Sequence, residues 1–393
     1  MAQETPITSP KFMTDFRCAG GACPETCCSS FLVDVDRATF RAYMAVKAPD
    51  LGDQLKRHVK KRGNERTDSS YARIQLTPAG ACPFLDDERL CSIQKRLGES
   101  GLSETCRSFP RERWTRDGRD YMGGKLSCPE AARLCLAAPD AMTLSDAGDA
   151  EPTVRGVVVA AIEAAARDRD LPIWKAILFA GVITETFLPE GQAEAAADAK
   201  LRQTIEDYAA ETRQALLEED FALGDQALTQ LKILAAVALS AAAKCNPNLN
   251  RFPAISQRAI GAILEGAEGF DSARARYGAL YRERFKPFDD AHDHALRNYV
   301  LNYLYVNRTF LSGPILPQFQ TLAVKFGVIR LLLVGLSGVQ PDGLDIDDYA
   351  AVVSAASRIL DHDASVSAEI SAALDAVEPR SASLAIRMVI PPA

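Results

Sequence analysis

The sequence has 393 residues, enough for one large domain or two smaller ones with a well-packed core. Hydrophobic residues make up 47% of the chain and charged residues 25%, which excludes a disordered protein and is typical of a soluble globular one. The formal net charge of −7 argues against nucleic acid as a partner. The charge is uneven, because residues 51–125 carry sixteen Lys or Arg against eleven Asp or Glu, which is +5 and leaves −12 for the rest.

The N-terminal residues and the apolar stretches predict the cellular compartment of the protein. The opening residues, MAQETPITSPKFMTDF, lack a basic segment followed by an apolar one, so we expect no secretory signal. The longest apolar stretch, FGVIRLLLVGLSGV, contains an arginine and is too short to span a bilayer. We therefore expect a cytoplasmic protein with no membrane partner. Thiols stay reduced in the cytoplasm, where clustered cysteines are more often metal ligands or catalytic groups than disulfides.

Cysteines are concentrated in the first third of the chain, where nine of the ten precede residue 136. Because thiolates bind soft metals, a set of four would suit a tetrahedral zinc ion or an iron–sulfur cluster. The chain lacks the paired C-x2–4-C knuckles of zinc fingers, which favours a cluster and leaves zinc as the alternative. Cys135 and Cys245 are interpreted as buried core thiols. The candidate ligands are the other eight: Cys18, Cys23, Cys27, Cys28, Cys82, Cys91, Cys106 and Cys128.

The character of the sequence changes at AAPDAMTLSDAGDAEPT, residues 137–153, which reads as a linker. Before it, short helical stretches at 35–46 and 86–98 alternate with loops that carry cysteine or proline. After it, helical periodicity predicts one helix after another, in the segments 170–188, 190–219, 225–241, 289–311 and 345–362. We predict a mostly α fold, with a cysteine-rich metal domain of loops and short helices at 1–140 and an α-helical bundle at 141–393.

Three segments carry a resemblance to a known family. FRCAGGACPETCCSSFLVDVDRATFRAY, CPFLDDERLCSIQKRLGESGLSETCRSFPR and LSCPEAARLCL together resemble the flagellin lysine-N-methylase family (FliB-type). Its cysteine-rich half is also similar to small YkgJ-type proteins that chelate zinc or iron. The resemblance extends past residue 153, because LRNYVLNYLYVNRTFL and SRILDH resemble the family's Asn/Tyr-rich helix and its Ser-Arg…His helix.

The resemblance implies transfer of methyl groups from S-adenosylmethionine to lysine side chains of flagellin, or of another lysine-bearing protein. It also implies that the cysteines hold an iron–sulfur cluster, of the 4Fe-4S type. Lysine methylation needs a neutral amine, so a phenol or carboxylate beside the substrate is expected. Tyr299 and Tyr303, one helical turn apart, are the candidates for this catalytic role, with an aromatic core stripe as the alternative. Arg358 and His362, also one turn apart, are the candidates for binding the methyl donor.

Other interpretations of the chain remain open. The protein could be a non-enzymatic module that chelates zinc or iron to sense, store or deliver metal, or that binds a protein partner. A deep polar pocket between the cysteines and the helices would favour the enzyme, whereas a packed junction would favour the module. His292 and His294 flank Asp293 and could bind a metal or form a solvated helix start. The basic run KRHVKKRGNER, residues 56–66, could be a solvated face or could anchor the methyl donor or an acidic substrate surface.

Overall fold

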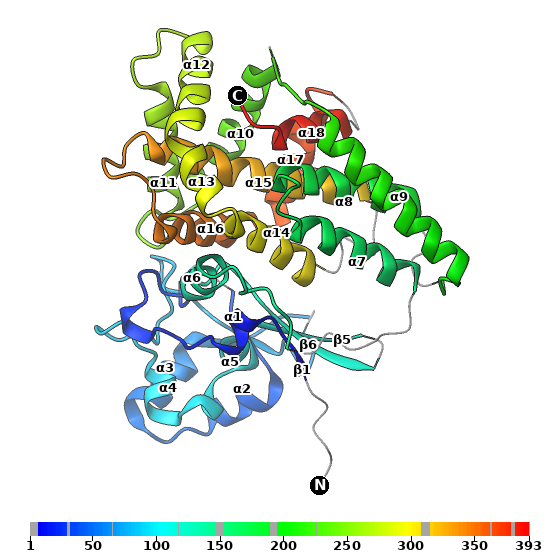
Figure 1. Ribbon diagram of the computed structural model, residues 1–393. Coiled ribbons are helices and arrows are strands. Elements are labelled where there is room, and N and C mark those ends of the chain that lie inside the picture. Colours follow the sequence, from blue (N-terminus) through cyan, green and yellow to red (C-terminus); the bar gives the residue numbers. More distant parts are fainter. Residues whose placement is uncertain are drawn as a thin grey trace.

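Helices dominate the fold, as the periodic segments predict, and they form the upper part of the molecule in Figure 1. The computed structural model describes residues 7–29, 32–64, 66–116, 118–145, 153–188, 195–224, 226–307, 315–361, 364–378 and 382–392. Beyond residue 150 the helices are α7 (Val154–Arg167), α8 (Ile173–Phe187), α9 (Ala199–Glu218), α10 (Gln226–Ala243), α11 (Phe252–Leu264), α12 (Phe270–Leu280), α13 (Lys286–Ala291), α14 (His294–Val306), α15 (Ile315–Ser337), α16 (Ile346–Leu360), α17 (Ala364–Asp375) and α18 (Ala382–Val389), with a π-helical turn at Tyr281–Phe285.

Aspartates begin several of these helices, because a carboxylate can accept hydrogen bonds from backbone N–H groups that have no partner within the helix. Asp198 accepts from the N–H of Leu201 at 2.7 Å, and Asp345 accepts from the N–H of Asp348 at 2.8 Å. One expectation was wrong. The segment 289–311 is not a single helix, because α13 ends at Ala291 and α14 begins three residues later, at His294.

The first 140 residues contain strands as well as the predicted short helices. The helices are α1 (Lys11–Thr14), α2 (Arg37–Met44), α3 (Pro49–His58), α4 (Ser92–Leu97), α5 (Glu104–Ser108) and α6 (Pro129–Ala137), with 3-10 turns at Gly20–Ala22 and Glu99–Gly101. The strands are β1 (Ile7–Thr8), β2 (Asp34–Val35), β3 (Val59–Lys61), β4 (Ala72–Ile74), β5 (Arg111–Arg116) and β6 (Arg119–Gly124). They form two three-stranded sheets, one in the order β1-β6-β5 and the other in the order β2-β4-β3. We expected neither sheet.

Two separate hydrophobic cores hold the chain together. A small core lies under the β2-β4-β3 sheet and gathers buried side chains between Val33 and Leu102. The large core fills the helical part, and it also takes in α1 and α6. Helix α6 packs against α14 and α16, so it lies at the junction between the two parts in Figure 1. The cysteine-rich segment is thus divided between both cores, and the boundary at residue 140 stays a prediction.

Among the residues that the structure describes, two helices are long and apolar enough to cross a membrane, by length and composition: α10 and residues 317–337 of α15. The apolar stretch FGVIRLLLVGLSGV is thus the second part of a longer helix. Within the protein, however, 94% of the α15 window is buried, as in the central helix of a soluble core. Its two cations also make internal hydrogen bonds. Lys325 donates to Asp361 at 2.7 Å, and Arg330 donates to the backbone oxygens of Val389 at 2.5 Å and Ile390 at 2.7 Å, at the end of α18.

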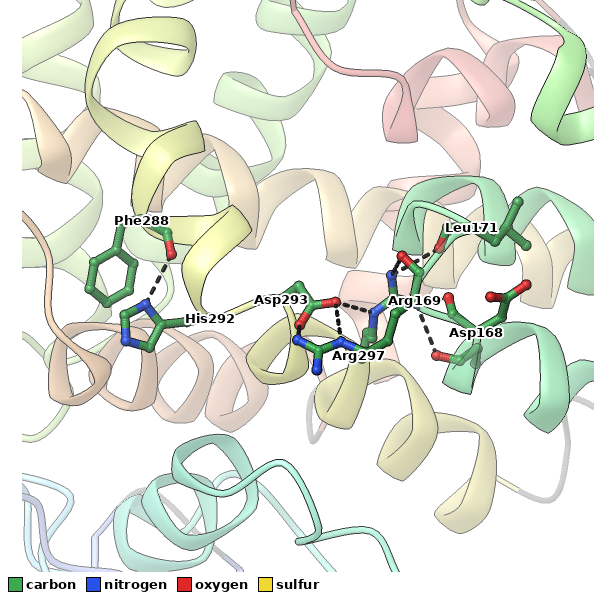
Figure 2. Close-up of polar contacts among 8 residues, drawn as sticks. Asp168, Arg169, Leu171, Phe288, His292, Asp293 and Arg297 are labelled. Carbon is green, nitrogen blue, oxygen red and sulfur yellow. Dashed lines mark hydrogen bonds and ion pairs between the residues drawn. The ribbon is translucent and has the colours of Figure 1, made fainter.

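A buried arginine joins α14 to the end of α7 (Figure 2). Arg297 donates from Nη1 to the backbone oxygen of Asp168 at 2.7 Å and from Nη2 to that of Leu171 at 2.9 Å. Its Nε donates to the carboxylate of Asp293 at 3.0 Å, one helical turn earlier. These carbonyls follow the last turn of α7, where no helical N–H can reach them, so the arginine supplies the missing donors.

We expect Arg297→Met to lower the free energy of unfolding by about 3 kcal/mol, because it leaves the carbonyls of Asp168 and Leu171 without this donor and Asp293 with only the exposed Arg169. Arg169 is a matched control, since it binds the same Asp293 at 2.8 Å while 71% of its side chain is exposed. Arg169→Met should cost less than about 1 kcal/mol. Urea unfolding measures both variants, and equal losses would contradict a structural role for the buried arginine.

Candidate active site

The first four cysteines lie on a loop that folds back on itself. A 3-10 turn at Gly20–Ala22 separates Cys18 from Cys23, and it starts with Gly20 in the left-handed region at φ +56°, which favours glycine. The thiol of Cys18 accepts from the N–H of Gly20 at 3.4 Å. Thr26 then orients the end of the loop, because its hydroxyl accepts from the N–H of Cys28 at 3.1 Å.

The later cysteines are placed by secondary structure. Cys82 is tied to the loop directly, since its N–H donates to the backbone oxygen of Cys28 at 2.9 Å. Cys91 and Cys128 stand immediately before α4 and α6, and Cys106 lies within α5. Burial raises the pKa of Cys128, although the backbone N–H groups of Glu130 and Ala131 at the start of α6 act in the opposite direction.

A cavity of about 1490 Å³ lies between the cysteines and the helical part. We call it the cysteine cavity. Its wall on one side contains six of the eight predicted ligands: Cys18, Cys27, Cys28, Cys82, Cys91 and Cys106. The opposite wall comes from the helical part, through Lys244, Cys245, Asn246, Asn250, Arg358 and Ile359. The other two predicted ligands are close by, because burial raises the pKa of both Cys23 and Cys128 and a charge on Cys27 adds to the rise.

The pKa values of the adjacent thiols Cys27 and Cys28 are shifted in opposite directions. A hydrogen bond from Cys28, aided by the charge of Arg358, lowers the pKa of Cys27 to about 7. The same hydrogen bond, together with burial, raises the pKa of Cys28 well above its ordinary value. Burial also raises the pKa of Cys82 and of Cys128 to about 12. Most of these thiols therefore need a cation beside them before they become thiolates.

The predicted donor set consists of cysteine thiols, which can bind either zinc or an iron–sulfur cluster. Four thiolates around one tetrahedral ion must lie about 4 Å from one another, given metal–sulfur bonds of about 2.3 Å. Within the described residues, no three Cys, His, Asp or Glu side chains are grouped so that they could hold an ion. A cluster takes one thiolate per iron and so accepts sulfurs that are farther apart. Metal binding by these cysteines stays a prediction.

Arg358 links the cysteine loop to the helical part. Its side chain is only 1% exposed and forms an ion pair with Glu25, which is 6% exposed, at 3.3 Å. Its Nη2 also donates to the backbone oxygen of Thr26 at 2.7 Å. Glu25 in turn accepts from the N–H of Arg251 at the start of α11, at 3.0 Å. Arg358 therefore lines the cysteine cavity, whereas His362 lies outside the described residues, and the donor-binding role of both stays a prediction.

Tyr299 and Tyr303 lie in the large core, and neither is among the residues that line the cysteine cavity. Burial, with a contribution from the charge of Asp361, raises the pKa of both phenols. A phenol with a raised pKa stays protonated, so it is a poor base for deprotonating lysine. Lys325 lies 5.4 Å from the Tyr303 ring and donates to Asp361 at 2.7 Å. The catalytic role of the two tyrosines stays a prediction.

The histidine pair is part of the junction between helices. The Nδ1 atom of His292 is 3.0 Å from the backbone oxygen of Phe288, and the two rings are stacked. Asp293, between the histidines, is engaged by Arg297 and Arg169, which hold the pKa of its carboxyl below the usual range against the effect of burial. Figure 2 places this carboxylate among the arginines rather than beside the imidazole. The site is a structural ion-pair network.

Sequence reasoning missed one residue beside the cavity, Glu25, and one that lines it, Cys245. Glu25 stands inside the cysteine motif, and its position among the ligands was the available signal. Cys245 was interpreted as a core thiol, but it is only half-buried and lines the cavity, where it accepts from the Asn250 amide at 3.5 Å. Cys135, by contrast, is fully buried, as predicted.

The contribution of the Arg358–Glu25 ion pair can be measured from the free energy of unfolding of variants. Arg358→Met should lower the free energy of unfolding by about 3–5 kcal/mol, because it leaves a buried carboxylate without its cation. Adding Glu25→Gln to the same chain removes that stranded charge and should restore at least half of the loss. Chemical denaturation gives both values. A double variant as unstable as Arg358→Met alone would contradict a direct charge interaction.

The helical part of the chain matches a known protein family. Residues 163–385, from α7 to α18, match the FliB lysine N-methylase C-terminal domain family. The chain is 38% identical over 147 residues to proteins named lysine-N-methylase from Salmonella typhimurium and Salmonella choleraesuis, a match covering 37% of this chain. The matched part spans 36% of the length of those two relatives. A flagellar biosynthetic protein, FliU, of Salmonella muenchen is 37% identical over 147 residues, covering 37% of this chain and 85% of its own. No solved structure matches.

Proposed function

Because the chain belongs to the FliB lysine N-methylase family, we propose that it is a cytoplasmic protein-lysine N-methyltransferase that uses S-adenosylmethionine. Its substrate in this proposal is flagellin, in keeping with a relative whose name is flagellar biosynthetic protein. The observation that carries the proposal is the family match over α7–α18, whose helices supply one wall of the cysteine cavity.

The cavity favours the enzyme over a metal-chelating module. A module that only stores or senses metal needs no space beyond its ligands, whereas methyl transfer must accommodate a donor and a lysine side chain together. The cavity of about 1490 Å³ exceeds the range of about 300–1,000 Å³ usual for one small ligand. Its polar wall from the helical part, with Lys244, Asn250 and Arg358, faces the cysteines as an enzyme requires.

The walls of the cavity also suit the chemistry. The methyl group leaves the sulfonium of the donor, which becomes a neutral thioether, and bonds to the lysine nitrogen, which releases a proton. That nitrogen must first be neutral, although lysine has an ordinary pKa of about 10.4. Apolar lining residues such as Val33, Ile93 and Leu102 disfavour the charged amine. Arg111, over the Phe16 ring at 5.1 Å, adds a positive charge to the same wall.

The chain's own residues would hold the bound groups as follows. The eight cysteines are the proposed ligands of an iron–sulfur cluster, with zinc as the alternative. Arg358 is the candidate for the carboxylate of the methyl donor, at the wall that Glu25 fixes. A metal group bound there would tie the loop to both cores, so its binding energy would add to the stability of the folded chain.

The ligand set predicts a contrast between two cysteines that line the same cavity. Cys91→Ala should remove metal and lower the melting temperature, because a ligand of a natively bound metal contributes to folding. Cys245→Ala should change neither, since it is not a proposed ligand. Metal analysis of anaerobically purified protein, with thermal unfolding, measures both. Equal metal content in the two variants would contradict the assignment.

The activity itself is tested by incubating the anaerobically purified protein with methyl-labelled S-adenosylmethionine and flagellin. We expect label on flagellin lysines, located by mass spectrometry, and no label on flagellin whose lysines have been acetylated. Acetylation removes the nucleophile and leaves the rest of the substrate intact. Metal-loaded protein that transfers no label to flagellin would support the metal-chelating module instead.

A further inference from the structure

A second hollow adjoins the cysteine cavity and has a different character. It has a volume of about 720 Å³ and follows β3 and β4. We call it the basic groove. Its lining comprises Leu32, Lys60, Lys61, Arg62, Gly63, Asn64, Arg73, Ile74, Gln75 and Leu76. Leu32, Ile74 and Leu76 line the cysteine cavity as well, so the two hollows meet along a shared apolar rim.

The sheet register explains why charge collects in the groove. Lys60 of β3 pairs with Arg73 of β4, which pairs with Asp34 of β2, so the three side chains form a row across one face. Arg62 joins the row from the end of β3. Asp34 serves both arginines, at 3.0 Å from Arg73 and 3.5 Å from Arg62. One carboxylate thus faces three cations, and like charges directly opposite each other disfavour pairing.

The lysines of the groove gain no neutralising partner. Lys60 donates to the backbone oxygen of Lys56 at 2.9 Å. Lys61 lies over two aromatic rings, 5.6 Å from Phe40 and 5.9 Å from Tyr71. Neither contact cancels a charge. The described lining of the groove contains four cations and no acidic side chain, on a chain whose net charge is −7.

We propose, on the basis of the methylase function, that the basic groove docks an acidic segment of the protein substrate beside the lysine to be methylated. The shared rim lets a chain pass from the groove into the cysteine cavity. Leu32, 65% exposed, offers an apolar contact at that passage. Groups of like charge in a concave surface attract an opposite charge most strongly, and they fix which stretch of a partner enters. The lysine then reaches the cavity while its acidic neighbours stay in the groove.

The test measures binding, without methyl transfer, by the anisotropy of two labelled peptides. Both carry one lysine, followed in the first by a run of glutamates and in the second by an equal run of glutamines. The intact protein should bind the glutamate peptide at least about fivefold more tightly at about 0.05 M salt, and the difference should vanish at about 0.5 M. Lys60→Glu should weaken that binding at least about threefold. This variant should fold, because it places a carboxylate opposite Arg73.

Lys47→Glu is the matched control, since it makes the same charge change on an exposed residue that lines neither hollow, and it should leave binding unchanged. Equal affinity for both peptides, or equal losses in the two variants, would overturn the proposal. So would an RNA oligonucleotide that displaces the glutamate peptide more effectively than the unlabelled peptide does. Selective binding without any methylation would overturn the methylase function and leave the docking groove standing. Methylation with equal affinity for both peptides would overturn the docking groove and leave the methylase function standing.

Discussion

The buried ion pair between Arg358 and Glu25 is the interaction on which the site depends. It joins residues 333 positions apart, from the last turn of α16 and from the middle of the cysteine loop. Burying two charges is costly unless each is also hydrogen-bonded. Here the arginine also binds the backbone of Thr26, and the carboxylate also accepts the N–H of Arg251. The pair therefore fixes the loop against α11 and α16 in one position, and Cys27 and Cys28 follow directly after it.

That constraint matters because the cavity lies between two cores that are otherwise separate. Cys82, Cys91 and Cys106 are carried by the small core under the β2-β4-β3 sheet. Cys128 belongs to the large core, through α6. The loop from Cys18 to Cys28 bridges them, joined to one side by the backbone bond to Cys82 and to the other by Arg358. The spacing of the thiols thus depends on how the two cores are held together. A group bound by thiolates from both cores would add a third link to the Cys82 backbone bond and the Arg358 contact.

The sequence predicts the local features well and the long-range ones poorly. Helices such as α8, α10 and α16 were found because their apolar residues repeat with the helical period. The strands were missed because they are two to six residues long and mostly polar outside the core. A turn signal was present in Asp117-Gly118 between β5 and β6, with Gly118 at φ +72°, and it would have identified that hairpin. The clustering of cysteines pointed to a shared site, but the positions of Cys245 and Glu25 depend on contacts between distant segments.

The central claim is that the cysteine cavity, with one wall from each part of the chain, is where the methyl donor binds. Hydrogen–deuterium exchange with and without S-adenosylmethionine tests it most directly, because burial of the cavity walls slows exchange there. The account predicts slower exchange in residues 22–29 and 244–250 together, on opposite walls, with no change in the exposed helix α9. Unchanged exchange in both walls, or slowing confined to segments outside the cavity, would contradict it.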